Sequence, residues 1–216
     1  MDYKDHKEYF ETAYRTGSDI WTHIPTKERG EMLTNELPKG ALILDVGSGR
    51  GLFAKQLAEN GYSVIGIDFE PNIVKRANEE IKNWDLQGKL RFVEGDALDI
   101  PFTDESFDGV YSFGLMENLY KDDWTKYASE IIRVLRPGGF YLNVSMSRET
   151  QQFLGFNPKG SDSGDFERYG IHYYFFNKEE VRDIFTGQLD LIEQKIESVE
   201  SPDKISLLAS LFRKKK

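Results

Sequence analysis

Short apolar runs and longer amphipathic stretches alternate along the chain from residue 41 onward. The short runs are rich in β-branched residues and predict seven strands, at 41–46, 63–68, 90–94, 109–112, 140–146, 191–199 and 206–212. The longer stretches predict four helices, at 51–60, 71–86, 123–135 and 178–186. This alternation is typical of a parallel β-sheet that is covered by helices on both faces.

Helix and turn signals agree with this pattern. Pro71 stands where a first helical turn is expected, and the Arg-Pro-Gly-Gly sequence at 136–139 predicts a helix end followed by a turn. Only residues 200–204 separate the last two predicted strands, which is too short for a helical crossover. We therefore expect an α/β fold with a Rossmann-like, seven-stranded, mostly parallel sheet and a reversed terminal hairpin.

Two segments lie outside the alternation. Residues 1–38 are rich in aromatic side chains and predict one or two helices that pack on the sheet as an N-terminal arm or lid. Residues 147–176 contain four glycines and predict a long insertion loop, of a length typical of functional lids. Because 216 residues suffice for one well-buried core, we expect residues 1–216 to form a single domain.

Composition and charge narrow the class of protein. Apolar runs are far shorter than the ~20 residues of a membrane span, and the first ten residues lack an apolar signal core, so we expect a soluble, cytoplasmic protein. The first five residues also resemble the start of an epitope tag, which stays open as an alternative. The net charge is −9 and basic residues concentrate only at 213–216, so we expect no nucleic-acid partner. Cysteine is absent and the three histidines are scattered, so we expect neither a thiol nucleophile nor a metal site.

The most informative segment is the run from residue 42 to 51, an apolar strand that leads into three glycines and then a helix. Glycine allows a turn with positive φ and a close approach of ligand to backbone, and the helix that follows offers free N–H groups. Dinucleotide enzymes usually space their glycines as G-x-G-x-x-G, whereas Gly47, Gly49 and Gly51 alternate and Asp45 ends the strand. Both differences argue against a nicotinamide-dependent oxidoreductase.

With Asp45 included, this segment resembles the first motif of the class I S-adenosylmethionine-dependent methyltransferases. The resemblance extends from about residue 42 to residue 212. It includes Asp68 at the end of the second strand, residues 95–102 followed by Ser-Phe-Asp at 106–108, the turn at 134–139, and the terminal hairpin. It implies S-adenosylmethionine as cofactor and S-adenosylhomocysteine as product.

The resemblance also suggests how the cofactor is held. Asp68 would accept hydrogen bonds from the ribose hydroxyls. Asp96 would accept from the adenine amine, Ala97 and Phe69 would line the ring, and Ser112 would lie near the methionine end. The full set of expected cofactor-binding residues is Asp45, Gly47, Ser48, Gly49, Gly51, Asp68, Phe69, Asp96, Ala97, Ser112 and Trp21.

Each of these residues also has a structural interpretation. Asp45 could cap a turn, Asp68 and Asp96 could be ordinary strand-end aspartates, and the glycines could serve packing. Together, however, they fall at the carboxyl ends of consecutive parallel strands, which is where open α/β sheets bind ligands.

Candidate acceptor-binding residues are Tyr14, Glu117, His172 and Tyr173. Many relatives carry histidine at the positions of Glu117 or Asn118, and this chain does not. Glu117 either binds a cationic acceptor or the amino group of the cofactor, or it caps a helix or faces solvent. His172 and Tyr173 belong to an aromatic stretch that either covers a substrate or forms a strand edge, and Tyr14 either covers the cleft or fastens its helix to the sheet. Catalytic residues are not assigned, because an amine or thiolate needs only orientation whereas a hydroxyl needs a base.

These observations predict a methyltransferase that acts on a small molecule by in-line transfer. The alternative is a non-catalytic sensor or scaffold that binds S-adenosylmethionine with the same fold. The acceptor, the atom that is methylated and the oligomeric state stay open at this point.

Overall fold

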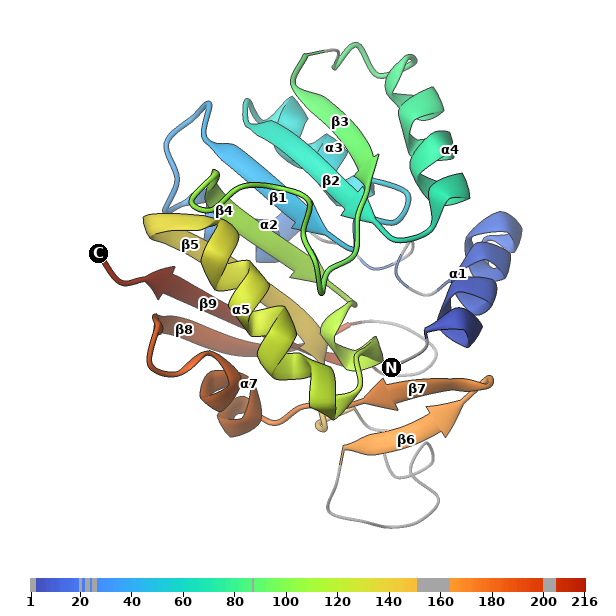
Figure 1. Cartoon of the computed structure of the whole chain (residues 1–216), viewed down its shortest axis with the longest axis vertical. Coiled ribbons are helices and arrows are strands. Elements are labelled where there is room, and N and C mark those ends of the chain that lie inside the picture. The colour runs from blue at the N-terminus through green and yellow to red at the C-terminus, as the bar shows by residue number, and fades with distance from the viewer. Residues whose placement is uncertain are drawn as a thin grey trace.

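A seven-stranded sheet forms the centre of the molecule, with helices on both of its faces (Figure 1). The computed structural model describes residues 3–19, 21, 24, 27–86, 88–150, 164–199 and 205–216. The strand order is β3-β2-β1-β4-β5-β9-β8. The strands are β1 (Leu42–Val46), β2 (Ser63–Asp68), β3 (Leu90–Glu94), β4 (Phe107–Phe113), β5 (Leu135–Met146), β8 (Leu189–Ser198) and β9 (Ser206–Lys214).

The first five strands are parallel, and β9 is antiparallel to both β5 and β8. The expected α/β class, the strand count and the reversed terminal hairpin are thus confirmed. The chain starts in the middle of the sheet at β1, moves outward to β3 and then crosses back to β4. This reversal next to β1 creates the position at which ligands bind to open α/β sheets.

Helices cover the two faces because alternate residues of each strand point to opposite sides. The helices are α1 (Lys4–Thr16), α2 (Lys27–Thr34), α3 (Leu52–Glu59), α4 (Pro71–Ile81), α5 (Trp124–Val134) and α7 (Lys178–Phe185). Ile43 packs with α2, α3 and α4 in one core, whereas Leu44 packs with α5 and α7 in the other. In Figure 1, α5 crosses the near side of the sheet, and α2 and α3 lie behind it.

Local sequence signals define several helix ends. Pro71 occupies the first turn of α4, and the Glu70 side chain accepts a hydrogen bond from the Asn72 backbone N–H at 2.9 Å. α7 begins with a capping box, in which Asn177 and Glu180 each accept a hydrogen bond from the other's backbone N–H. α1 ends at Gly17, whose φ of 70° places it in the left-handed region that glycine adopts without strain.

Two sequence predictions are wrong in detail. Residues 136–139 do not form a turn before the fifth strand, since β5 begins at Leu135 directly after α5 and bulges at this point. The bulge surrounds Asp108, which pairs with Arg136 and also accepts a hydrogen bond from the Leu42 N–H at 2.8 Å. The described part of the expected 147–176 loop contains an antiparallel hairpin, β6 (Asp165–Arg168) and β7 (Ile171–Tyr174), while residues 151–163 lie outside the described residues.

Candidate active site

A cavity of about 780 Å³ lies at the carboxyl ends of β1, β2, β3 and β4. Its volume is within the range of small-molecule and cofactor sites. The ends of β1, β2 and β3 contribute seven of its lining residues, which are Gly47, Asp68, Phe69, Glu94, Gly95, Asp96 and Ala97. The segment before β1 and the segment after β4 form the opposite walls.

The glycine loop is fixed to the neighbouring strand by backbone hydrogen bonds. The N–H groups of Gly47 and Ser48 both donate to the Ile67 carbonyl, at 2.9 and 2.8 Å. Gly49 has a φ of 50°, and a Cβ atom built on it would lie 2.7 Å from the Tyr14 hydroxyl. A side chain at this position would therefore be strained and would also collide with α1.

The three glycines differ in what surrounds them. Gly47 lines the cavity, whereas a Cβ on Gly51 would lie 2.1 Å from the Phe92 ring. Gly51 is thus required for packing between α3 and β3, which is the structural interpretation left open from the sequence. Ser48 does not line the cavity, and its buried hydroxyl has no hydrogen-bond partner among the described residues.

Asp68 is the best-placed carboxylate in the cavity. One of its oxygens accepts a hydrogen bond from the Gly49 N–H at 2.9 Å and the other accepts from the Glu70 N–H at 3.1 Å. Burial raises the pKa of Asp68 to about 6, and these N–H groups limit the rise. At neutral pH Asp68 is therefore mainly ionised and can accept further hydrogen bonds from a ligand.

Asp45 lies behind this carboxylate and does not line the cavity. Burial, together with the charge of Asp68, raises the pKa of Asp45 to about 8. Asp45 is thus mainly protonated at neutral pH, which avoids two adjacent buried charges.

The turn after β3 presents Asp96 and Ala97 to the cavity. Asp96 is exposed, and one of its oxygens accepts a hydrogen bond from the Leu98 N–H at 2.8 Å, which closes the turn. Phe69, at the end of β2, lines the same part of the cavity, and the Lys7 ammonium lies 5.2 Å from the centre of its ring.

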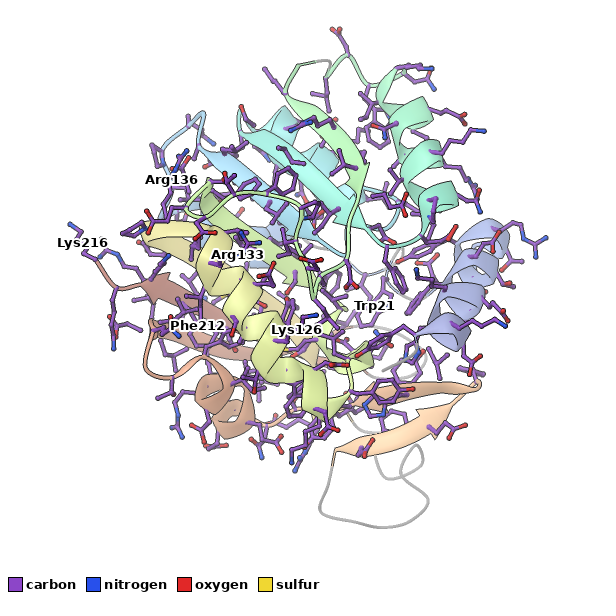
Figure 2. The ribbon with its side chains drawn as sticks, in the orientation of Figure 1. Trp21, Lys126, Arg133, Arg136, Phe212 and Lys216 are labelled. Atoms are coloured by element: carbon purple, nitrogen blue, oxygen red, sulfur yellow. The ribbon has the colours of Figure 1, made fainter. Side chains whose placement is uncertain are left out.

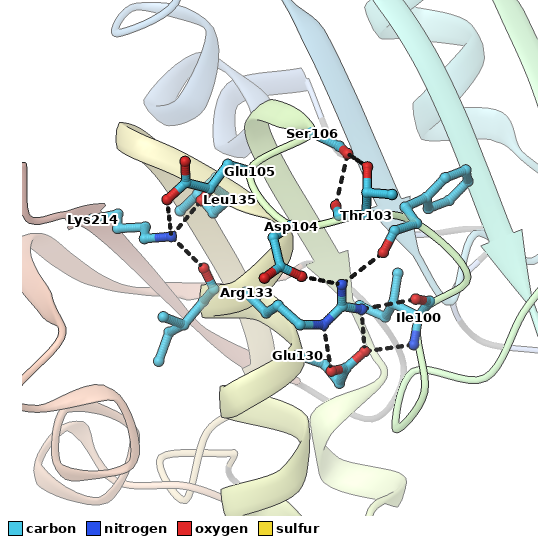
Figure 3. A network of polar contacts seen from close by, with 11 residues as sticks. Ile100, Thr103, Asp104, Glu105, Ser106, Glu130, Arg133, Leu135 and Lys214 are labelled. Carbon is cyan, nitrogen blue, oxygen red and sulfur yellow. Dashed lines mark hydrogen bonds and ion pairs between the residues drawn. The ribbon is translucent and has the colours of Figure 1, made fainter.

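The residues that follow this turn are held by an ion pair on α5, Glu130 with Arg133 (Figure 3). The Arg133 guanidinium donates to the carbonyls of Ile100 at 2.9 Å and Phe102 at 2.6 Å, while Glu130 accepts from the Ile100 N–H at 2.7 Å. At the end of the same helix, Lys214 of β9 donates to the carbonyls of Ile132 and Leu135. The backbone that follows the Asp96 turn is therefore supported by charge-assisted hydrogen bonds.

The N-terminal arm covers the cavity. His6, Phe10 and Tyr14 follow one another at a spacing of four along α1, so they share one helical face, and all three line the cavity. Trp21 completes this wall. Its ring lies 5.1 Å from that of Phe113, and a Cβ on Gly114 would contact it at 2.7 Å. Figure 2 shows Trp21 on the side of the sheet that faces α1.

Four of the expected site residues do not line the cavity, because their side chains are buried in or packed against other parts of the protein. They are Ser112, Glu117, His172 and Tyr173. Ser112 belongs to a buried hydrogen-bond network with the Tyr141 hydroxyl at 3.0 Å and the Asn143 side-chain Oδ1 at 3.3 Å. The Tyr173 ring stacks on Phe166 at 5.5 Å.

Glu117 and His172 do not line the cavity, although the segment that follows β4 does so through Gly114, Leu115, Asn118 and Leu119. Glu117 is completely buried, neither carboxylate oxygen has a hydrogen-bond partner of normal geometry among the described residues, and burial raises its pKa to about 8. The backbone N–H groups of Glu117 and Met146 oppose this rise only in part. His172 pairs with Asp165 at 3.0 Å and stacks on the ring of Tyr120 at 4.8 Å.

The sequence did not single out His6 or Asn118, although both line the cavity. For His6, the available signal was its place on the same helical face as Phe10 and Tyr14. For Asn118, it was only the proximity to the end of a central strand. Within the described residues there is no group of three or more carboxylate and imidazole side chains that could hold a metal ion, and no helix long and apolar enough to cross a membrane.

Comparison with known proteins finds a matching domain and similar proteins. Residues 44–143 match the family model described as a methyltransferase domain. Demethylmenaquinone methyltransferase of Desulfitobacterium hafniense is 32% identical over 121 residues, which are 54% of this chain and 47% of that protein. An O-methyltransferase of Aspergillus nomiae is 34% identical over 121 residues, 56% of this chain and 52% of that protein. The chain thus spans about half the length of these curated relatives.

Solved structures agree on the fold over a longer stretch. The 1,6-didemethyltoxoflavin-N1-methyltransferase of Burkholderia thailandensis, solved with its substrate and S-adenosylhomocysteine, superimposes with a TM-score of 0.79 at 20% identity and covers 98% of this chain and 88% of its own. An S-adenosylmethionine-dependent methyltransferase of Methanosarcina mazei gives a TM-score of 0.76 at 22% identity, covering 85% of this chain and 97% of its own. Residues 44–143 thus match a methyltransferase domain, and the chain as a whole has the fold of these solved methyltransferases.

Proposed function

We propose that this protein transfers a methyl group from S-adenosylmethionine to a small molecule and releases S-adenosylhomocysteine. One observation carries the proposal. Gly47, Asp68 and Asp96 come from three different strand ends and line a single cavity, in the order in which β1, β2 and β3 lie in the sheet. This is the arrangement expected for an extended nucleoside ligand at a switch point.

The residues present fit the cofactor. Asp68 is ionised, lines the cavity and would accept hydrogen bonds from the ribose hydroxyls, while Asp96 would accept from the adenine amine. Phe69 and Ala97 would contact the adenine ring, and Gly47 would let the ligand approach the backbone. Asp45, Ser48, Gly49 and Gly51 would shape the loop beneath it, and Ser112 would act only indirectly, from behind the methionine end.

The cofactor supplies an electrophilic methyl group on a positively charged sulfur. The aromatic wall of Tyr14, Trp21 and Phe113 suits such a cation and also keeps water away from it. We place the methyl end between these rings, near the end of β4, because the carboxylates for the adenosine part stand at β2 and β3.

For the acceptor, we propose a small molecule that enters beside α1. Tyr14 is then the one of the four acceptor candidates that lines the cavity, while Glu117, His172 and Tyr173 would act through the wall that they support. The similar proteins include a demethylmenaquinone methyltransferase and a 1,6-didemethyltoxoflavin-N1-methyltransferase, each named for a small-molecule acceptor. The net charge of −9 further disfavours nucleic acid. A single domain over residues 1–216 and a cytoplasmic location belong to the same proposal.

Two measurements test the proposal. Calorimetry should detect S-adenosylhomocysteine binding to the wild type, and a panel of phenols, amines, thiols and metalloid anions should then give acceptor-dependent release of S-adenosylhomocysteine from S-adenosylmethionine. Binding without turnover by any acceptor would favour the non-catalytic alternative, which the curated relatives do not support. Absence of binding would refute both.

A further inference from the structure

His6 is a buried imidazole whose ring lines the cavity. Its side chain is only 2% exposed, it lines the cavity, and neither ring nitrogen makes a hydrogen bond of normal geometry among the described residues. The His172 backbone lies close by. Buried ring nitrogens are normally hydrogen-bonded, so an unsatisfied pair facing a cavity points to a ligand that completes them.

The ring of His6 is held in place by packing. It lies edge-on to Tyr3 at 5.3 Å and to Tyr120 at 5.7 Å. The Tyr3 hydroxyl donates to Asp123 at 2.8 Å and accepts from the Tyr120 N–H at 3.0 Å, which fixes both tyrosines. The imidazole is therefore oriented before any ligand arrives, as an efficient acid–base group must be.

A second unsatisfied atom lines the same part of the cavity. The Asn118 amide donates to the Gly114 carbonyl at 2.9 Å, which fixes its orientation, while its buried Oδ1 has no hydrogen-bond partner among the described residues. Asn118 follows β4, and Tyr120, against which His6 packs, comes two residues later. Both unsatisfied groups thus belong to or pack against the segment that follows β4.

The charge state of His6 suits proton acceptance. Burial lowers the pKa of His6, and the neighbouring His172 on β7 lowers it further, while Asp5 on α1 and the His172 backbone act in the opposite direction. Tyr3 and Tyr120 complete its surroundings. A neutral imidazole has one nitrogen with a free lone pair, as a general base requires.

We propose that His6 is the general base for a hydroxyl acceptor carried on a planar ring, a phenol or an enol, which binds beside Asn118. The inference rests on the proposed methyltransferase function and names its substrate class. An unsatisfied imidazole nitrogen and an unsatisfied amide oxygen both call for a ligand that donates hydrogen bonds. Phe10, Tyr14 and Leu119 offer the apolar surface that a planar ring would cover.

The step balances without a further reactant. The hydroxyl proton moves to His6 while the oxygen forms a bond to the methyl carbon. The carbon–sulfur bond breaks and its electron pair stays on sulfur, so the positive charge moves from sulfur to the imidazolium. His6 then returns its proton to water. In this chain, α1 would thus provide the histidine that many relatives carry after the fourth strand.

The test compares wild type with His6→Phe, which keeps a ring for packing but has no nitrogen, and with His6→Ala. S-Adenosylhomocysteine affinity should stay within about two-fold of wild type in both, because His6 packs against the segment that follows β4. Methylation of phenols should fall about 10²–10⁴-fold in both variants, while methylation of a thiol should change little. Added imidazole should restore part of the phenol activity of His6→Ala only.

A readout without turnover uses 4-nitrophenol and S-adenosylhomocysteine together. The ¹⁵N resonances of the His6 imidazole should shift when the phenol is added to the wild type. The inference is overturned if these resonances do not move, if His6→Phe methylates phenols at the wild-type rate, or if the wild type methylates only amines and thiols. Failure of the wild type to bind S-adenosylhomocysteine would instead refute the proposed function itself.

Discussion

The buried Glu117 carboxyl makes a quantitative prediction about stability. It is completely buried without a hydrogen-bond partner of normal geometry among the described residues, and its pKa is raised from 4.5 to about 8 by burial. In the unfolded chain the carboxyl ionises with its ordinary pKa. An acid whose folded pKa is raised contributes full stability below its unfolded pKa and loses that contribution as pH rises toward the folded value. The free energy of unfolding should therefore fall between about pH 4.5 and pH 8.

The size of this effect follows from the pKa values. At 1.36 kcal/mol for each tenfold change in proton affinity, the full loss is roughly 4–5 kcal/mol, of which about 3–4 kcal/mol falls between pH 5 and pH 8. Glu117→Gln removes the titration but keeps the shape of the side chain. When pH rises from 5 to 8, the free energy of unfolding of Glu117→Gln should increase by about 3–4 kcal/mol relative to that of the wild type. Burial of the amide changes the stability of the variant by the same amount at both pH values, so it does not affect this difference.

Urea unfolding at pH 5 and pH 8 measures the difference directly. Asp45 and Asp68 also titrate in this range, but they are present in both proteins and cancel in the comparison. Glu79→Gln, at an exposed position on α4, is the matched control and should follow the wild type. If Glu117→Gln and wild type differ by the same free energy at both pH values, Glu117 is not a buried titrating group and the reasoning fails.

Three further predictions concern the cofactor site. Asp68→Ala should weaken S-adenosylhomocysteine binding by about 1–3 kcal/mol in calorimetry while the protein stays folded, and an unchanged affinity would remove Asp68 from the ribose site. Gly49→Val should abolish binding, since its Cβ would lie 2.7 Å from the Tyr14 hydroxyl; normal binding by a folded variant would show that the ligand lies elsewhere. Hydrogen exchange should show that S-adenosylhomocysteine protects residues 9–21 and 168–176, because Tyr9 stacks on Tyr169 at 6.1 Å and couples the two segments; protection only at 47–51 and 96–98 would contradict closure.

Much of the fold could be predicted from sequence because each strand is a distinct apolar run and each crossover a distinct amphipathic one. The bulge at residues 136–139 could not, because it depends on Asp108, a residue of the neighbouring strand, and Arg-Pro-Gly-Gly has the composition of a turn. Of the β6–β7 hairpin, only a strand edge at His172 and Tyr173 was anticipated, as one of two alternatives, because the two strands are only four residues long and follow a glycine-rich stretch.

In the site, too, local sequence patterns predict some features, whereas others depend on contacts between distant residues. Gly47, Asp68 and Asp96 could be placed together because parallel strands bring their carboxyl ends to one edge. The position of α1 depends on contacts with distant residues, such as that of Tyr3 with Asp123, and no local pattern encodes them. The spacing of His6, Phe10 and Tyr14 indicates one shared helical face, but only the folded molecule shows that this face lines the cavity.

The C-terminal end of α5 connects the segment that follows the Asp96 turn to strand β9. Arg133 and Glu130 hold the backbone after the Asp96 turn, and Lys214 of β9 binds the carbonyls at the end of the same helix (Figure 3). Fraying of this helix end would release both the turn and the strand. We therefore expect the Asp96 side of the cavity and the antiparallel part of the sheet to open together in local unfolding, so that a ligand bound at the Asp96 turn also slows the opening of β9.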